Sequence, residues 1–394
     1  MTERDAYIAL NMVKGMGVVT LRKAISILGS ARKVFDCNTE ELAQVRGVGI
    51  TRAEMILEEL RKVDWKKEKE YAESKSVKFI TIIDDDYPEL LKKISYPPMV
   101  LYVLGDAKVL NTPAVGIVGT RNPSLYGKAM TKKFAYGLAQ RGVCVISGLA
   151  HGIDTEAHSA TLLGKGKTVA VVGSALDCLY PRDNIELARS IIRSGGAVIS
   201  EYPFGVLGSR QTFPMRNRII SGLSRGVLVV EAAMNSGSLI TAERAMEQNH
   251  PVMAIPGRLD SELSAGTNRL ISEGARLVET VDNVIDEMNS MHLYNLEVPS
   301  HSPTHLQQNK EFSISAKGFE NKEWPKFEKP KPKLDAIEQK LLDALGTEEM
   351  TADALIACSG VPPAQIGARL ISLEMKGLIN RYPGNVLKAK STKG

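Results

Sequence analysis

The feature that most constrains the fold is a regular alternation of short apolar runs and helix-length segments between residues 75 and 290. Most runs are apolar at consecutive positions, which indicates strands that are covered on both faces. Helices between successive strands imply right-handed crossovers, so the pattern predicts an α/β domain with a doubly wound parallel sheet. The expected strands lie at residues 79–83, 115–118, 143–146, 169–172, 198–199, 227–230 and 252–255.

Other regions flank this domain of residues 75–290. Residues 1–70 have apolar residues at helical spacing and two Gly-x-Gly turns that each precede a helix, a pattern that can grip a phosphate or simply join two helices. Residues 291–334 are rich in proline and polar residues without an apolar period, so we expect a flexible linker. Residues 335–390 recover helical patterning and end in a hairpin pattern, which together predict a winged helix.

Composition narrows the class of protein. The 394 residues are 43% hydrophobic and 24% charged, the balance of a soluble globular protein, and no run of 18 apolar residues predicts a membrane span. The charged start lacks a signal peptide, and the four cysteines form no C-x-x-C pair, so we expect a protein of the reducing cytoplasm. The net charge of +5 permits a polyanionic partner but does not require one.

The first candidate for ligand binding is the turn after the expected strand at 115–118. Gly119 lets a ligand approach the backbone closely, and Arg121 adds a forked cation. Ser124 stands where the next helix starts, and a helix start offers unpaired N–H groups and a positive dipole end. The combination predicts a site for an anion, most simply a phosphate. The alternative is a glycine that only turns the chain and an arginine that is only solvated.

The same construction returns after two other strands, at Ser147-Gly148 and around Ser238. Because the carboxyl ends of parallel strands share one edge, three such turns are expected to line one groove. Residues 211–220 add Phe213, Arg216, Asn217 and Arg218. The arginines suit backbone phosphates and the ring suits a base, which is typical of a site for single-stranded nucleic acid. Alternatively, Phe213 belongs to the core and one arginine is structural.

Several other motifs indicate no chemistry. Residues 164–168 end like a Walker A motif but precede a strand, and no complete G-x-G-x-x-G follows any strand. His151, Asp154 and His158 share a helix face but lack an evident further ligand. The Asp84–Asp86 run is expected to be a polar turn rather than a nuclease cluster. We therefore expect no metal, no cofactor and no catalytic residue.

Over about residues 80 to 290 the chain resembles the DprA (Smf) family of DNA-processing proteins. The resemblance rests on the order and number of its motifs, which makes it specific in this region and weaker in the flanks. These motifs lie at residues 119–127, 147–154, 173–181, 200–203, 213–224, 230–232, 236–242, 256–257 and 266–268.

The resemblance implies an extended Rossmann-like domain that binds single-stranded DNA without catalysis, flanked by a SAM/helix-hairpin-helix-like domain and a winged helix. It also implies that the protein protects incoming single strands, loads the RecA recombinase onto them during natural transformation, and forms a homodimer. Carried onto this chain, the DNA groove would use Gly119, Arg121, Ser124, Ser147, Gly148, Phe213, Arg216, Asn217, Arg218 and Ser238.

Two alternatives remain open. The first is an enzyme similar to the LOG-type phosphoribohydrolases, whose Pro-Gly-Gly-x-Gly-Thr turn corresponds here to residues 235–241. The glycine cluster is missing there, although Glu231 and Glu243 remain. The second is an interaction module whose functional end is the winged helix. Residues 335–394 carry seven acidic and seven basic residues, so this domain lacks the basic surface of a strong DNA binder.

Overall fold

The computed structural model describes residues 1–290, 335–346, 349–362, 366, 369–370, 372–373, 378–382 and 386–389. The predicted linker at 291–334 lies outside the described residues, and so does most of the helix expected at 365–376. The chain divides into two compact units, Met1–Phe319 and Glu320–Gly394. Among the described residues, no helix is long and apolar enough to cross a membrane.

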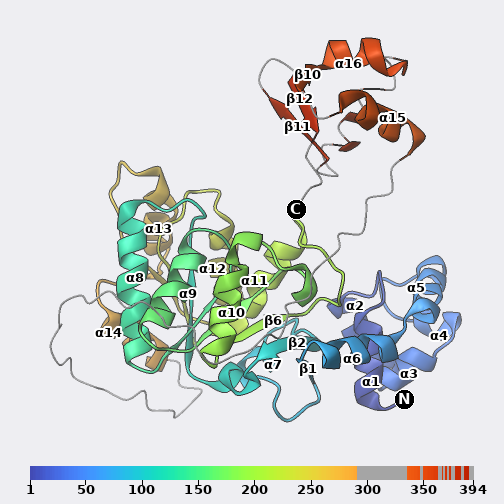
Figure 1. The fold of residues 1–394 in the computed structure, drawn as a ribbon. Coiled ribbons are helices and arrows are strands. Elements are labelled where there is room, and N and C mark those ends of the chain that lie inside the picture. The colour runs from blue at the N-terminus through green and yellow to red at the C-terminus, as the bar shows by residue number, and fades with distance from the viewer. Residues whose placement is uncertain are drawn as a thin grey trace. The chain divides into compact units, whose positions relative to one another are not determined.

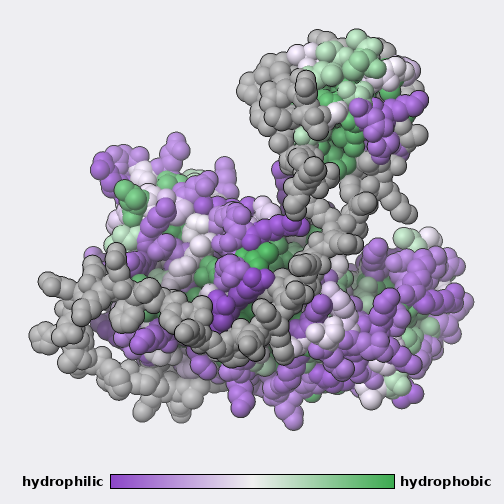
Figure 2. Space-filling model, in the orientation of Figure 1, coloured by the Kyte–Doolittle hydropathy of each residue, from purple (hydrophilic) through white to green (hydrophobic). Residues whose placement is uncertain are grey.

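Residues 1–74 fold into short helices whose ends are fixed locally. Thr2 and Asp5 form a capping box, which satisfies the N–H groups that a helix start leaves unpaired. Gly17 and Gly49, from the two Gly-x-Gly turns, directly precede helices. Figure 2 shows that hydrophilic residues cover most of the visible face of these helices. They are α1 (Glu3–Asn11), α2 (Val18–Leu28), α3 (Ala31–Asp36), α4 (Thr39–Ala43), α5 (Ile50–Lys62) and α6 (Trp65–Ser74).

A nine-stranded sheet forms the centre of the first unit (Figure 1). Its strands lie in the order β1-β2-β6-β5-β4-β3-β7-β8-β9. From β6 to β9 all neighbours are parallel, whereas β2 is antiparallel to both β1 and β6. The predicted doubly wound parallel sheet is therefore confirmed, with an antiparallel edge. The strands are β1 (Val77–Thr81), β2 (Val100–Gly105), β3 (Ala114–Val118), β4 (Cys144–Ser147), β5 (Thr168–Val171), β6 (Ala197–Ser200), β7 (Val227–Val229), β8 (Val252–Ala254) and β9 (Arg276–Leu277).

Helices cover both faces of this sheet. Alternate residues of one strand enter different cores: Ile117 of β3 packs with Phe134 of α8, and Val118 packs with Ile219 of α11. Burial on both faces explains the continuous apolar runs in the sequence. The helices are α7 (Glu89–Lys92), α8 (Leu125–Gln140), α9 (Ile153–Leu163), α10 (Ile185–Arg193), α11 (Thr212–Gly222), α12 (Gly237–Glu247), α13 (Glu262–Ser272) and α14 (Val281–Ser290), with 3-10 turns η1 (Ala107–Asn111), η2 (Leu176–Cys178) and η3 (Arg182–Asn184).

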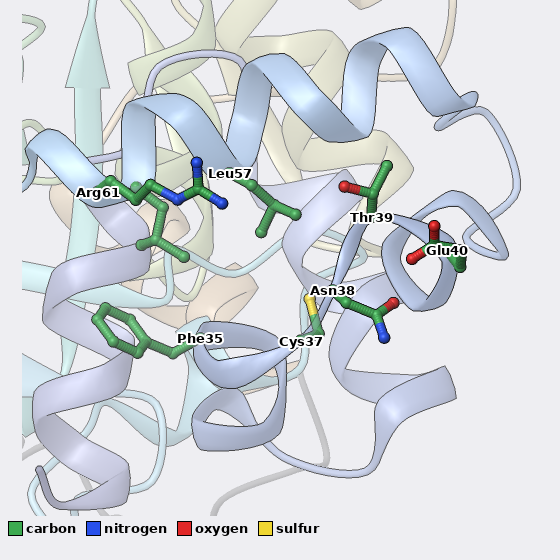
Figure 3. Close-up of a pocket in the computed structure, with 8 residues that line it drawn as sticks. Phe35, Cys37, Asn38, Thr39, Glu40, Leu57 and Arg61 are labelled. Carbon is green, nitrogen blue, oxygen red and sulfur yellow. The ribbon is translucent and has the colours of Figure 1, made fainter.

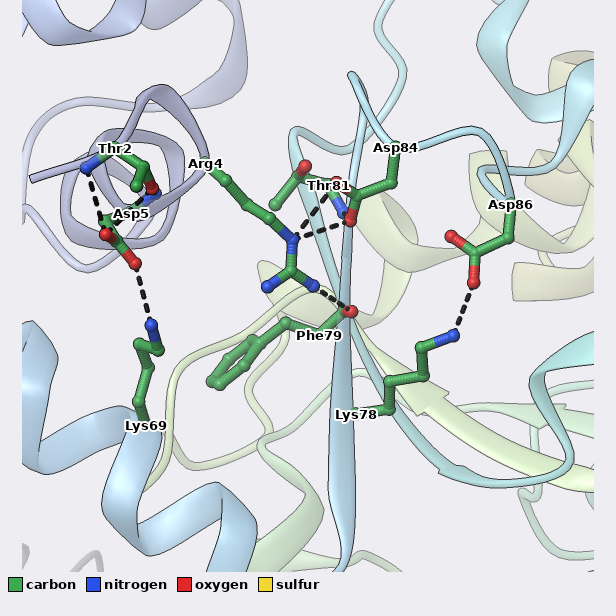
Figure 4. A network of polar contacts seen from close by, with 9 residues as sticks. All are labelled: Thr2, Arg4, Asp5, Lys69, Lys78, Phe79, Thr81, Asp84 and Asp86. Carbon is green, nitrogen blue, oxygen red and sulfur yellow. Dashed lines mark hydrogen bonds and ion pairs between the residues drawn. The ribbon is translucent and has the colours of Figure 1, made fainter.

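Polar contacts join the N-terminal helices to the antiparallel edge of the sheet (Figure 4). Arg4 of α1 donates from Nε to the Asp84 carboxylate at 3.0 Å and from Nη2 to the Phe79 carbonyl at 2.8 Å. The backbone N–H of Thr81 donates to the same carboxylate at 2.8 Å. The predicted polar turn at Asp84–Asp86 is thus confirmed, and Asp84 closes it.

The described residues of the second unit form helices and a small antiparallel sheet of order β10-β12-β11. Asp335 and Glu338 make a capping box at its first helix. Its core includes Leu341, Leu355 and Leu387 and shares no residue with the cores of the first unit. This arrangement agrees with the predicted winged helix. Its elements are α15 (Ala336–Leu345), β10 (Glu349–Thr351), α16 (Ala352–Ser359), β11 (Ile379–Tyr382) and β12 (Val386–Ala389).

Candidate functional site

The predicted site residues lie at the carboxyl edge of the parallel strands. Gly119 directly follows β3, Gly148 follows β4, and Glu231 comes shortly after β7. Strand β3 is flanked by β4 on one side and by β7 on the other, so the order of the chain reverses here. In doubly wound sheets this switch point is where ligands bind.

The turn after β3 is held by a buried carboxylate. Glu231 is 2% exposed and accepts hydrogen bonds from the Ser124 backbone N–H at 2.9 Å and from the Ser124 hydroxyl at 2.5 Å. The Ser124 hydroxyl in turn accepts from the Gly127 N–H, which caps α8. The start of α8 thus already has an anion, and that anion belongs to the protein. Gly119 lies beside this contact, because the next N–H, that of Thr120, donates to the Glu231 carbonyl.

The turn after β4 is built in the same way. The Asp154 carboxylate accepts from the N–H groups of Gly148 and Ala150, at 3.1 and 3.3 Å. The Ser147 hydroxyl points inward and donates to the Ile117 carbonyl at 2.7 Å. Burial raises the pKa of Asp154, and the nearby Arg216 guanidinium partly opposes that shift. Ser147 and Gly148, the two predicted residues of this turn, therefore make their hydrogen bonds within the protein.

Arg216 fills the space beside this turn. Its Nη1 donates to the carbonyl of Gly148 at 2.7 Å and to the carbonyl of Val171, so it ties the ends of β4 and β5 together. A Cβ added at Gly148 would stand 2.5 Å from the Arg216 guanidinium, which explains the glycine. Burial lowers the pKa of Arg216 to about 10, so the side chain stays charged at neutral pH.

A strained backbone lies next to these contacts. Leu149 has φ of 59° although it is not a glycine, and its side chain is fully buried. Such a conformation costs about 1–2 kcal/mol and needs support from its surroundings. Asn184 gives that support by donating its amide to the Leu149 carbonyl and to the Thr155 hydroxyl, both at 2.8 Å. Sequence reasoning missed Asn184, because no local pattern links it to a loop 35 residues away.

Arg218 is the second buried arginine of α11. It forms a bidentate ion pair with Glu201, with N–O distances of 2.8 and 2.6 Å, and its side chain is 6% exposed. Burial alone would lower the pKa of Arg218, but the Glu201 carboxylate outweighs it and the pKa is raised. The charge of Arg218 is therefore already neutralised, and a phosphate contact by Arg218 stays a prediction.

Two further predicted residues, Asn217 and Ser238, lie at the turn before α12. Asn217 donates its amide to the Gly237 carbonyl at 3.3 Å and accepts from Arg216 Nε at 3.2 Å. Ser238 is 7% exposed, and its hydroxyl lies 2.7 Å from the hydroxyl of Ser236, which caps the helix. The polar groups of this third turn are thus also hydrogen-bonded within the protein.

Arg121 and Phe213 are less buried than the two arginines of α11. Arg121 is exposed, and its Cζ lies 5.8 Å from the centre of the Phe213 ring. Phe213 is half-buried and packs against Gly173, where an added Cβ would lie 2.7 Å from the ring. Among the described residues Arg121 has no ion-pair partner. The two side chains therefore combine an available cation with a partly accessible ring.

The residues weighed as metal ligands do not converge. His158 is buried and hydrogen-bonds through Nδ1 to Thr168, and burial lowers the pKa of His158 to about 3. His151 is exposed, and its Nε2 lies 3.7 Å from a carboxylate oxygen of Asp183. The Asp154 carboxylate already accepts a hydrogen bond from the Gly148 N–H. In the described part of the chain, no group of three or more His, Cys, Asp or Glu side chains is arranged so that it could hold a metal ion.

The N-terminal helices contain a cavity of about 340 Å³ (Figure 3). Leu57 and Arg61 of α5 face Phe35 and Cys37 across it. Burial raises the pKa of Cys37 to about 11, so its thiol is protonated at neutral pH and is a weak nucleophile.

The two Gly-x-Gly turns of this region are linked by one side chain. Arg52 donates to the carbonyls of Gly15 and Gly47, at 3.1 and 3.0 Å. Arg52 therefore has a structural role in joining the hairpins. A DNA contact by these hairpins stays a prediction.

Comparisons with known proteins agree along the whole chain. The family model of DNA recombination-mediator protein A matches residues 78–289, the DprA winged helix domain matches 325–385, and a SAM-like helix-hairpin-helix tandem matches 7–62. Protein Smf of Synechocystis sp. is 33% identical over 97% of this chain and 98% of its own. DNA processing protein DprA of Streptococcus pneumoniae is 46% identical over 52% of this chain and 73% of its own. The X-ray structure of DprA from that organism superposes with a TM-score of 0.64 at 36% identity, covering 73% of this chain and 98% of that chain.

Fold and comparisons together define a class of protein: a Rossmann-like α/β domain between a helix-hairpin-helix domain and a winged helix. Within that class, the chain belongs to the DNA recombination-mediator protein A family, whose members include proteins named DprA and Smf. The predicted fold class and the predicted family resemblance are both confirmed.

Proposed function

We propose that this protein binds single-stranded DNA along the carboxyl edge of its central sheet, and mediates recombination by binding rather than by catalysis. The observation that carries the proposal is the exposed Arg121 guanidinium, 5.8 Å from the Phe213 ring at the switch point of the sheet. A cation beside an aromatic ring suits the phosphate and the base of one nucleotide. A duplex keeps its base faces stacked inside, so such a site favours single strands.

The internal carboxylates refine this mechanism. Glu231 occupies the start of α8, where a nucleotide phosphate would bind in a dinucleotide enzyme. Phosphate binding therefore falls to exposed cations, which makes it independent of sequence and sensitive to salt. The same contact leaves a LOG-like hydrolase one candidate carboxylate fewer, because Glu231 is committed to Ser124, whereas Glu243 is exposed.

Family membership supports finer activities, which we include in the proposal. These are protection of incoming single strands during natural transformation and loading of RecA onto them, by a cytoplasmic homodimer. A dimer would place two grooves on one strand and raise the apparent affinity without new contacts.

The test compares Arg121→Ala with Arg193→Ala, which removes another exposed arginine, from the end of α10 at the opposite edge of the sheet. Fluorescence anisotropy with labelled oligo-dT and the matching duplex, across a salt series, gives affinity and salt slope. We expect tight binding of the single strand by the wild type and by Arg193→Ala. Arg121→Ala should bind more weakly, and its salt slope should fall by about 0.7, the contribution of one phosphate of a single strand.

Two results would contradict the proposal. Unchanged binding by Arg121→Ala would move the DNA site away from the sheet edge. No binding of single strands by the wild type would reject the function, and release of free base from a nucleoside monophosphate would then favour the hydrolase.

A further inference from the structure

Tyr180 is an exposed aromatic residue at the same edge of the sheet. It follows β5 and η2, and the residue is 53% exposed. Its ring centre lies 5.8 Å from that of Phe213, with 39° between the ring planes. This separation is within the range of a direct aromatic contact and is too short for a base to enter between the rings.

The two rings differ in how much surface they can offer. Phe213 is the inner ring, since Gly173 and Gly208 pack against its edge and Arg121 stands over it. Tyr180 is the outer ring, and its hydroxyl makes no hydrogen bond with the described residues. A base that reaches this edge therefore finds more free aromatic surface on Tyr180 than on Phe213.

The backbone holds Tyr180 in place. Its neighbours Leu179 and Pro181 are both buried, so the exposed ring stands on an anchored segment. The Asp177 carboxylate, three residues earlier, accepts from the Gly205 N–H at 2.9 Å and fixes that segment to the loop after β6. A ring that is ordered before binding loses little entropy when a base stacks on it.

We propose that Tyr180 is the outer stacking platform for a DNA base, with Phe213 as its support and Arg121 as the adjacent phosphate contact. This inference rests on the proposed function and deepens it, because it assigns the ring that a base stacks on. The partner is a flexible single strand, whose unpaired bases expose the π-faces that Tyr180 can receive.

The experiment separates base contacts from phosphate contacts. Anisotropy is measured with oligo-dT and with an abasic oligonucleotide of equal length, which keeps the phosphates but lacks bases. The variants are Tyr180→Ala, Tyr180→Leu and Tyr180→Phe, with Arg121→Ala for the phosphate and Tyr136→Ala as a control. Tyr136 is 40% exposed on α8, the next-to-last turn of a helix whose start lies at the site.

We expect Tyr180→Ala and Tyr180→Leu to lose roughly 5- to 150-fold in affinity for oligo-dT, the effect of one lost base stack, and little for the abasic strand. Tyr180→Phe should bind like the wild type because it keeps the ring, and Tyr136→Ala should also be unchanged. Arg121→Ala should lose affinity for both strands.

Three outcomes would overturn the inference. If only Arg121→Ala is weakened, the site is correct but Tyr180 is not its platform. If Tyr180→Ala is weakened equally on both strands, the tyrosine acts through the structure of the loop. If neither variant is weakened, the proposed function at this edge fails and the inference fails with it.

Discussion

At the scale of single residues, the site is organised by buried carboxylates that occupy places where a ligand's anion was expected. Glu231 accepts from Ser124 at the start of α8, and Asp154 accepts from Gly148 in the next turn. The sequence pattern predicted an anion at the turn after β3, most simply a phosphate. It could not reveal that the anion is internal, because Ser124 and Glu231 are 107 residues apart and nothing in local spacing joins them.

The Glu231 contact gives a prediction about stability. Glu231→Gln keeps the shape of the side chain, but it removes the charge and turns an NH2 group toward donors of Ser124. A buried donor without its acceptor costs about 1–3 kcal/mol, so the free energy of unfolding should fall by that amount in urea denaturation. Glu247→Gln is the matched control, because that carboxylate is 60% exposed and pairs with Arg244 at the surface. Equal midpoints for the two variants would show that the turn does not depend on Glu231.

At the scale of elements, the predictable parts are those with local apolar patterns. The run at 115–118 became β3 (Ala114–Val118) almost residue for residue. Strand β2, which pairs antiparallel with β1 and β6, was not expected, although its residues 100–104 form a continuous apolar run. Helix α11 was not expected as a helix, since two arginines lie on faces of it that are buried. Those arginines can be buried only because distant acceptors receive them.

The ion pair between Arg218 and Glu201 gives a prediction about α11. Arg218→Met and Glu201→Leu each leave one buried charge without its partner, so each should lower the free energy of unfolding by about 3–5 kcal/mol. The double variant should lose less than the sum, because no unpaired charge remains. Chemical denaturation of all four proteins measures the coupling. Strictly additive losses would show that the pair is not an energetic unit and would leave Arg218 available for DNA.

At the scale of the whole molecule, the chain consists of two compact units with separate hydrophobic cores. Every residue that we assign to DNA binding lies in the first unit. The winged helix has as many acidic as basic residues over 335–394, so it adds no net attraction for a polyanion. Sequence patterns could separate the units, because a change in composition marks a boundary. They also favoured the α/β unit for DNA binding, but they could not show which of its arginines stay exposed after folding.

A truncation tests whether DNA binding belongs to the first unit alone. A chain that ends at residue 319 keeps both cores of the α/β unit, so its thermal unfolding midpoint should match the corresponding transition of the full protein. Its affinity for oligo-dT should stay within about twofold, which is ~0.4 kcal/mol, because no assigned contact is lost. Residues 320–394 alone should fold around their own core, as circular dichroism would show, and bind oligo-dT weakly. Loss of binding by the truncated chain, with tight binding by residues 320–394, would instead make the winged helix the functional end. The exposed Arg121 beside Phe213 argues for the first outcome, since it is the α/β unit that offers a free cation and a ring together.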